Sequence, residues 1–139
     1  VHNARHGDFR RLFFRMSGWQ TSGFVFPELR AQVNRRLDAL APKADQLAEG
    51  LDAVLRYALL GPGKRLRPLL LLATLSHLKA DPHSGLDVAC AVEMLHAASL
   101  VLDDLPCMDD AMLRRGQLAA HLRFGEDAAV LAAVALISR

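Results

Sequence analysis

Apolar residues recur at helical spacing through most of the chain, and this periodicity constrains the fold most. In the first such segment they fall at i, i+4, i+8 and i+11, namely Leu29, Val33, Leu37 and Leu40, which places them on one face of an amphipathic helix. Similar segments follow at about 45–61, from 67 onward, and at 86–104, 117–124 and 126–138. The stretch 69–75 is apolar nearly all round, so we expect it in the core. We find no strand signal, and the sequence predicts an all-α fold.

The composition is that of one globular domain. Of 139 residues, 52% are hydrophobic and 23% are charged, which fits a packed core rather than disorder. The net charge is only +2, so we expect no nucleic-acid partner. No apolar run reaches the roughly 20 residues that a bilayer span needs. Cys90 and Cys107 form no metal-binding or redox motif, which favours a reducing, cytoplasmic location.

Residues 1–24 differ from the rest of the chain. They are rich in arginine, contain Phe9, Phe13, Phe14 and Trp19, and show no clear helical period. We interpret them as an N-terminal extension that need not be native, with Met16 as a natural start. A basic, aromatic tail that touches a membrane surface is the alternative. The segment 25–139 is then treated as one domain.

Four carboxylates within eight residues follow an apolar run: Asp103, Asp104, Asp109 and Asp110. Like charges this close repel one another. Mg²⁺ suits such a group because it prefers carboxylate oxygens and keeps positions free for substrate phosphates. A solvated acidic loop is the alternative, which the apolar flanks disfavour. On a straight helix Asp103 and Asp109 diverge by about 120°, so they converge only if the chain bulges at Pro106. On a straight helix Asp110 would share a face with Asp103 instead. The spacing therefore does not decide whether Asp109 or Asp110 is the third carboxylate of the site.

A basic cluster lies at the start of another expected helix. After the flexible loop 61–63 come Lys64, Arg65 and Arg67, directly before Pro68. Three cations beside the free N–H groups of a helix start favour the binding of phosphate. A solvated charged surface is the alternative for this motif taken alone.

Three further residues connect the two clusters. Arg114 and Arg115 follow the acidic stretch after three residues and offer forked donors that suit a diphosphate. His96 lies seven residues before Asp103, nearly two helical turns, so these two residues share a helix face. The alternative for His96 is a core histidine whose hydrogen bonds are made within the protein.

Taken in order, these motifs resemble the short-chain trans-isoprenyl diphosphate synthases. The shared pattern is Gly-Lys-Arg-Leu-Arg-Pro, then Glu-x-x-His, then Asp-Asp-x4-Asp-Asp with Arg-Arg-Gly, then His-x-x-Phe-Gly-Glu, within residues 26–139. Residues 88–138 look most like the bacterial, carotenoid-type geranylgeranyl diphosphate synthases. The resemblance implies an all-α bundle of the isoprenoid synthase type, of which 25–139 would be the first half, and a homodimer in the complete enzyme.

The resemblance also implies a reaction and residue roles. An allylic diphosphate ionises, the double bond of isopentenyl diphosphate attacks, and a proton is lost. The residues implied to hold the diphosphate of isopentenyl diphosphate are Lys64, Arg67, His96 and Arg115. Those implied at the allylic diphosphate are Asp103 and Asp109 as ligands of Mg²⁺ (or Mn²⁺), Asp104 in support, and Arg114. Metal and arginine neutralise the leaving diphosphate, so no nucleophilic side chain is required.

Two residues of the same helix bear on product length. Ala98 and Ser99 lie five and four residues before Asp103, about one helical turn away. In the family, bulk at these positions closes the elongation tunnel. The small Ala98 therefore implies a product longer than farnesyl diphosphate, namely geranylgeranyl diphosphate. A close packing point between helices is the alternative for Ala98.

The sequence also departs from the family pattern. No second Asp-Asp pair follows Asp110, and Leu118 and Ala119 stand where the family usually has Pro-Thr. We therefore expect the 139-residue chain alone to be inactive, with an apolar patch left exposed on its inner helices. The alternatives are a truncated or regulatory subunit that pairs with a complete synthase, a terpene cyclase, which would not need the basic cluster, and a metal-buffering helical domain.

Overall fold

The computed structural model describes residues 25–41 and 50–139. Its elements are α2 (Val25–Leu40), α3 (Leu51–Leu60), α4 (Leu66–His77), the 3₁₀ turn η1 (Pro82–Gly85), α5 (Leu86–Asp103), β1 (Leu113–Arg114), β2 (Gln117–Leu118), α6 (Ala120–Phe124) and α7 (Glu126–Ile137). The predicted helical fold is confirmed. The basic, aromatic segment 1–24 and the predicted start of the second helix near Asp45 lie outside the described residues.

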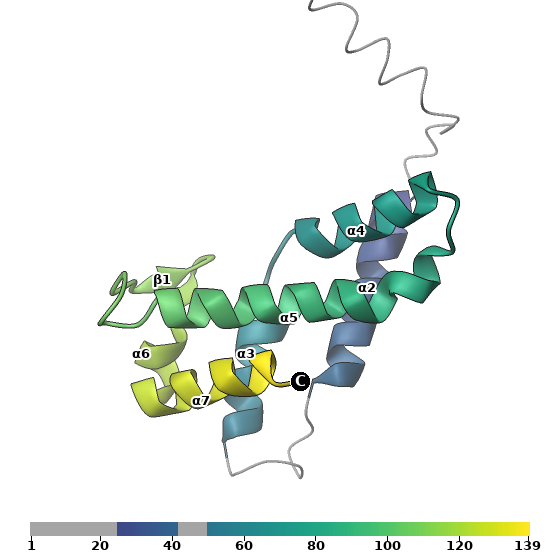
Figure 1. Ribbon diagram of the computed structural model, residues 1–139. Coiled ribbons are helices and arrows are strands. Elements are labelled where there is room, and N and C mark those ends of the chain that lie inside the picture. Colours follow the sequence, from purple (N-terminus) through teal and green to yellow (C-terminus); the bar gives the residue numbers. More distant parts are fainter. Residues whose placement is uncertain (1–24, 42–49) are drawn as a thin grey trace, which may run out of the picture.

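Helix α5 lies at the centre of the fold, with α2, α3, α4 and α7 packed around it (Figure 1). Its apolar residues include a set that is buried against these helices and a set that is exposed. By length and hydropathy alone, the segment Pro82–Asp103 is a candidate membrane span. Its apolar residues do not form one uninterrupted run, because Asp87, Glu93 and His96 lie among them. The contacts of α5 with four helices account for part of this apolar composition, whereas Val88, Val92 and Leu95 remain exposed.

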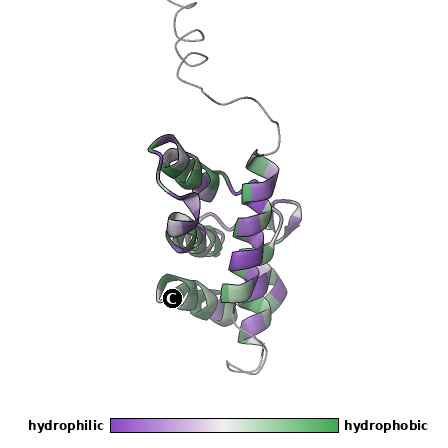
Figure 2. Cartoon of the chain, turned by 90° about the vertical axis from the view of Figure 1, so that its right-hand side faces the viewer, coloured by the Kyte–Doolittle hydropathy of each residue, from purple (hydrophilic) through white to green (hydrophobic). Residues whose placement is uncertain are grey.

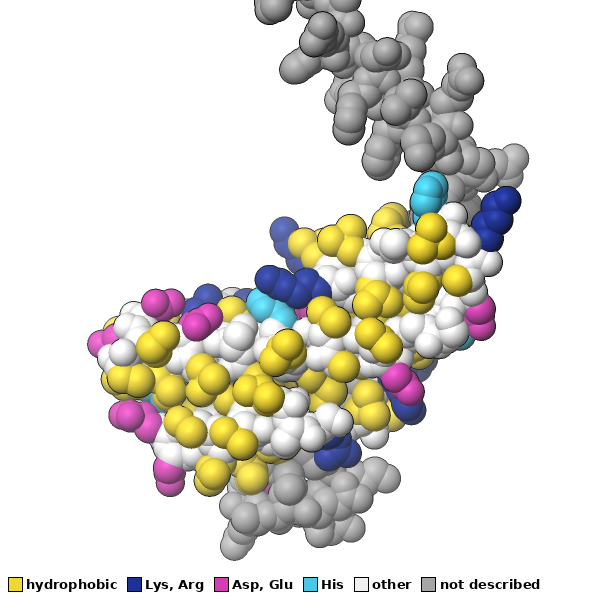
Figure 3. All heavy atoms as spheres, in the orientation of Figure 1, with side chains coloured by type: hydrophobic (Ala, Val, Ile, Leu, Met, Phe, Trp, Pro, Cys, Tyr) yellow, Lys and Arg dark blue, Asp and Glu magenta, His cyan; other side chains and the backbone are white. Residues whose placement is uncertain are grey.

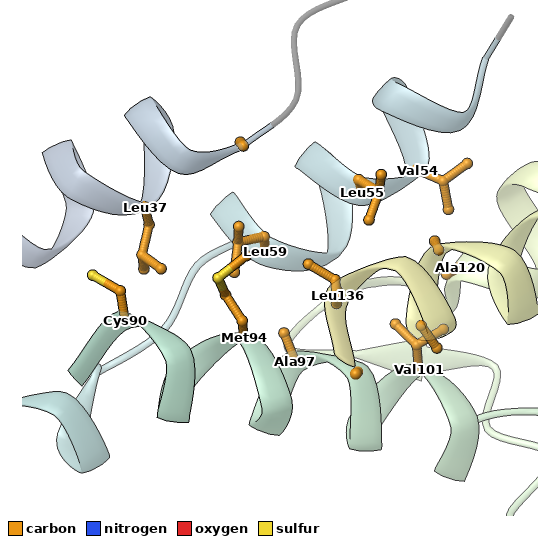
Figure 4. Packing of buried hydrophobic residues seen from close by; sticks show 14 of the residues in the cluster. Leu37, Val54, Leu55, Leu59, Cys90, Met94, Ala97, Val101, Ala120 and Leu136 are labelled. Carbon is orange, nitrogen blue, oxygen red and sulfur yellow. The ribbon is translucent and has the colours of Figure 1, made fainter. Parts of the chain in front are cut away.

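The core forms where α5 meets α2, α3 and α7 (Figure 4). Its members include Cys90, Met94, Ala97 and Val101 from α5, together with Leu37, Leu59 and Leu136 from the other three helices. Burying one leucine side chain of this kind contributes about 1.5–3 kcal/mol. Five fully buried alanines lie on α5 and α7, namely Ala89, Ala98, Ala129, Ala132 and Ala133. Their small side chains let these two helices approach closely.

Two details differ from the sequence-based expectation. Helix α4 was expected wholly in the core, but only one side of it is buried: Leu69 and Leu72 are buried, whereas Leu70 is 66% exposed. A short antiparallel hairpin, β1–β2, replaces the helix start expected at Gln117, so that α6 begins at Ala120. Strands of two residues are too short to leave an alternating apolar pattern in the sequence.

Large apolar side chains remain exposed on three helices. Figure 2 shows hydrophilic residues concentrated on α2, which follows the grey N-terminal trace, and mainly hydrophobic ones on α5 and α7. Figure 3 shows hydrophobic side chains gathered over α4, α5 and α7. The exposed members on these helices include Leu70, Val88, Val92, Leu95, Leu131 and Val134. The apolar patch expected on the inner helices is therefore present among the described residues.

Candidate functional site

The basic cluster is built on the loop 61–65, which connects α3 to α4. Arg65 precedes α4 in the left-handed conformation (φ 54°, ψ 37°), and its side chain points inward, so that the residue is only 5% exposed. Its guanidinium donates to Glu93 Oε1 of α5 at 2.9 Å and to the carbonyl oxygens of Leu59 and Gly61 at 3.0 Å each. The prediction that three cations together face a phosphate is therefore wrong for Arg65, which forms a buried ion pair.

The other two cations of the cluster stay exposed. Lys64 and Arg67, together with His96 of α5 and Arg115 of the hairpin, line one open pocket of about 450 Å³. Figure 3 shows a basic group beside a histidine at the junction of α4 and α5. The four residues that the resemblance implies around the diphosphate of isopentenyl diphosphate thus share one pocket. Its donors and positive charges suit a multiply charged anion.

His96 has a lowered pKa. Partial burial lowers the pKa of His96 from the ordinary value of 6.5, and the charge of Arg67 lowers it further, whereas Glu93 raises it. Without a ligand the imidazole is therefore mainly neutral at pH 7 and donates one N–H. An anion in the pocket would favour the protonated ring, because an opposite charge nearby stabilises the charged form.

The acidic stretch forms a tight turn rather than a continued helix. Helix α5 ends at Asp103, and the chain turns through Pro106 so that the Asp109 backbone N–H donates to the Asp103 carbonyl oxygen at 2.9 Å. The bulge that convergence of these two residues required is thus present in the backbone. Asp110 takes the left-handed conformation with φ 47°. The backbone arrangement favours Asp109 over Asp110 as the neighbour of Asp103.

Asp104 is buried and paired with Arg114. Its side chain is 4% exposed and forms an ion pair with Arg114, whose Nε donates to both carboxylate oxygens at 2.9 and 3.1 Å. This bond raises the pKa of Arg114, because the neighbouring carboxylate stabilises the guanidinium charge. The Ala111 N–H donates to the Asp104 carbonyl oxygen at 3.2 Å. Asp104 therefore orients Arg114 and closes the turn.

The hairpin brings Arg115 to the basic cluster. Arg115 and Gly116, with φ of 54° and 78°, form its two-residue turn, a conformation typical of hairpins with positive φ at both central positions. Arg115 Nη1 donates to the Pro62 carbonyl oxygen at 2.9 Å. A Cβ at Gly63 would collide with the Arg115 guanidinium, the flexible end of its side chain, so a substitution there would displace Arg115.

A second, smaller cavity connects the two motifs. It measures about 50 Å³, and its lining includes Glu93 and His96 from α5, the Asp104–Arg114 pair, and Arg115. A cavity of this size holds one or more water molecules. The basic and acidic motifs, about 40 positions apart, thus border the same space.

The acidic turn alone forms no complete metal centre. Within residues 25–41 and 50–139, no three metal-ligating side chains lie close enough together to hold an ion. Mg²⁺ commonly binds one or two carboxylates and completes its shell with water and substrate phosphate oxygens. Asp103, which is half-buried, and Asp109, which is exposed, fit that mode of binding.

The two residues considered for product length have different surroundings. Ala98 is fully buried in the core, as the packing alternative proposed. Ser99 is exposed, and its hydroxyl donates to the His96 carbonyl oxygen at 3.0 Å. Of the two side chains, only that of Ser99 is open to a ligand in this arrangement.

Sequence reasoning missed several residues around the pockets. Tyr57 Oη donates to the Leu118 carbonyl oxygen at 2.7 Å and anchors the hairpin to α3. Gln117 lines the smaller cavity. Glu93 was recognised only as part of Glu-x-x-His, yet it is the buried partner of Arg65. A carboxylate within an apolar helix is a signal that could have pointed to a buried cation.

Comparison with known proteins gives consistent matches. The family described as Polyprenyl synthetase matches residues 48–139. Geranylgeranyl diphosphate synthase from Pantoea ananas is 54% identical over 114 residues, which cover 81% of this chain and 37% of that protein. The enzyme of the same name from Pseudescherichia vulneris is 44% identical over 113 residues, which cover 80% of this chain and 36% of that protein.

Solved structures agree with these sequence matches. An FPP/GFPP synthase from Zymomonas mobilis superimposes with a TM-score of 0.76 and 34% identity, over 93% of this chain and 43% of that one. The chain thus spans well under half the length of the relatives it matches.

Proposed function

Because the chain belongs to the polyprenyl synthetase family, we propose that its residues supply part of the active site of a prenyltransferase. The reaction joins an allylic diphosphate to isopentenyl diphosphate by ionisation, condensation and proton loss, with geranylgeranyl diphosphate as product. The pocket that gathers Lys64, Arg67, His96 and Arg115 is the observation that carries this proposal. We further propose that the protein acts in the cytoplasm and forms a homodimer.

The open pocket would hold the diphosphate of isopentenyl diphosphate. Lys64 and Arg67 offer exposed charges, and Arg115 offers a guanidinium held by a single backbone contact. His96 donates an N–H and becomes more easily protonated when the anion is present. These groups bind without reacting, since a diphosphate that only positions a substrate needs charge and hydrogen bonds.

The acidic turn would hold Mg²⁺, or Mn²⁺ in its place, through Asp103 and Asp109. When bound, the metal would neutralise charge on the leaving allylic diphosphate. Arg114 would add a donor to the same diphosphate. Asp104, buried and paired with Arg114, would support the site by orienting this arginine rather than by ligating metal.

The product length is assigned from the relatives and from the residues one helical turn before Asp103. Geranylgeranyl diphosphate is supported by the two bacterial relatives, which are geranylgeranyl diphosphate synthases, and by the absence of bulk at Ser99. Since Ala98 is buried, Ser99 is the position at which added bulk would shorten the product.

A non-catalytic subunit that pairs with a complete synthase is the second candidate. The exposed apolar side chains of α4, α5 and α7 favour it, because apolar patches of this kind often mark interfaces. Co-purification with a complete synthase would support this candidate.

Binding of isopentenyl diphosphate is the direct test, because it depends on residues within this chain. In isothermal titration calorimetry, the parent chain should bind it saturably, and Lys64→Ala/Arg67→Ala should reduce the affinity by at least about tenfold. The matched control is Arg35→Ala/Arg139→Ala, which removes two exposed arginines that line neither pocket. Equal loss in both double variants, or no binding by the parent, would contradict the proposal.

A further inference from the structure

The buried ion pair between Arg65 and Glu93 forms part of the lining of the open pocket. We propose that this pair is a positioning device, which holds Lys64, Arg67 and His96 in the geometry that receives a diphosphate. The inference rests on the proposed function. Both residues line the pocket, yet their side chains are almost fully buried, at 4% and 3% exposure, and their charges are paired with each other, so they act through the exposed groups around them.

Arg65 connects three helices through one guanidinium. Its Nε donates to Asn34 Oδ1 of α2 at 3.0 Å, and its Nη1 donates to Glu93 Oε1 of α5 at 2.9 Å. Its Nη2 donates to two carbonyl oxygens at the end of α3 and in the loop that follows, each at 3.0 Å. A lysine could not reproduce this set, because its three donors radiate from one nitrogen.

The backbone at Arg65 explains how the neighbouring cations are separated from it. A left-handed conformation is uncommon for residues other than glycine and persists only where the surroundings hold it. Here it lets the Arg65 side chain enter the core while Lys64 and Arg67 remain at the surface. The Leu69 N–H also donates to the Arg65 carbonyl oxygen at 3.1 Å, which starts α4.

Glu93 extends the same device to His96. The two residues are three positions apart on α5, so they lie on neighbouring parts of one helix face. Both line the open pocket, and the Glu93 carboxylate raises the pKa of His96 against the effect of burial. Glu93 Oε2 is buried and has no hydrogen-bond partner among the described residues. The adjoining cavity has room for a water molecule that would satisfy this oxygen.

A stabilising role and a positioning role predict different binding when both partners of the pair are replaced. Replacing both partners of a buried pair with apolar residues of similar size is often neutral or stabilising, whereas removing one partner is costly. Arg65→Met/Glu93→Leu should therefore stay folded. If the pair only stabilises, binding should survive in this variant. If the pair positions the loop, binding should be lost.

The experiment compares the affinity for isopentenyl diphosphate by calorimetry with the thermal melt of each variant. The matched control is Arg36→Met/Asp87→Leu, which removes the exposed pair between α2 and α5, at 41% and 69% exposure. We expect the control to bind within about twofold of the parent, and Arg65→Met/Glu93→Leu to bind at least about tenfold more weakly while still melting cooperatively.

Arg65→Lys keeps the inference testable if the double variant does not fold. It retains the charge but cannot reach all four acceptors, so we expect binding to weaken here too. A folded Arg65→Met/Glu93→Leu or a folded Arg65→Lys that binds like the parent would overturn the inference, while the proposed function would stand. A parent chain that binds no isopentenyl diphosphate would overturn the proposed function and the inference with it.

Discussion

The two partners of the Asp104–Arg114 ion pair should differ in the cost of their removal, because they differ in burial. The Asp104 side chain is 4% exposed, whereas that of Arg114 is 37% exposed. Arg114→Met leaves a buried carboxylate without its donors, and breaking a buried pair in this way costs about 3–5 kcal/mol. Asp104→Asn leaves an arginine that water can reach, so we expect a cost of about 1–2 kcal/mol.

Urea denaturation followed by circular dichroism would measure the free energy of unfolding of each variant. The matched control is Arg56→Met, because Arg56 is 38% exposed and pairs with Asp38, which is itself 60% exposed. Such a surface pair contributes at most about 1 kcal/mol. The reasoning fails if Asp104→Asn costs as much as Arg114→Met, or if the Arg56 variant loses as much stability as the Arg114 variant.

Four further predictions follow from the same structure. At pH 8 a thiol reagent should modify Cys107 rapidly and Cys90 only after denaturation, because burial raises the pKa of Cys90 to about 11; two fast thiols in the folded chain would contradict this. Since the pKa of His96 is lowered on folding, the unfolded chain takes up a proton first, and stability should fall as the pH drops below about 6.5. His96→Asn should flatten that dependence in denaturation curves, whereas His77→Asn, at an exposed position of α4, should not. Ala98→Phe should lower the free energy of unfolding by about 1–3 kcal/mol, because the larger side chain overfills the core. Ser99→Phe should change it by less than about 0.5 kcal/mol. The reverse order of the two variants in thermal melts would refute the placement of these residues. Gly63→Ala should displace Arg115 from the Pro62 carbonyl oxygen, with a stability loss below about 1.5 kcal/mol but weaker calorimetric binding of isopentenyl diphosphate; unchanged binding would exclude a role for this contact.

Helix positions followed from the sequence because they depend on local periodicity. The stripe Leu29, Val33, Leu37 matches a buried helix face. The helix breakers Gly61 and Pro106 lie within three residues of the ends of α3 and α5. The exposure of Leu70 could not be predicted in the same way. It depends on which neighbours cover each side of α4, and that is a tertiary property.

The site was only partly predictable for a similar reason. Spacing showed that Asp103 and Asp109 could meet only through a bulge, but the turn that joins their backbones depends on hydrogen bonds that spacing does not reveal. The inward position of Arg65 had no signal in its own neighbourhood, because residues other than glycine seldom take a left-handed conformation. Gly116 could have indicated the turn of the hairpin, since glycine favours positive φ, but two-residue strands leave no pattern that would have identified the hairpin itself.

Chemical-shift mapping of the backbone amides tests the central claim most directly. In ¹H–¹⁵N correlation spectra, added isopentenyl diphosphate should shift the amides of residues 63–67, His96 and Arg115 in a saturable manner, and inorganic pyrophosphate should shift the same amides. Shifts that are absent from these residues, or spread over the exposed arginines of α2 instead, would contradict the assignment of this pocket as a diphosphate site.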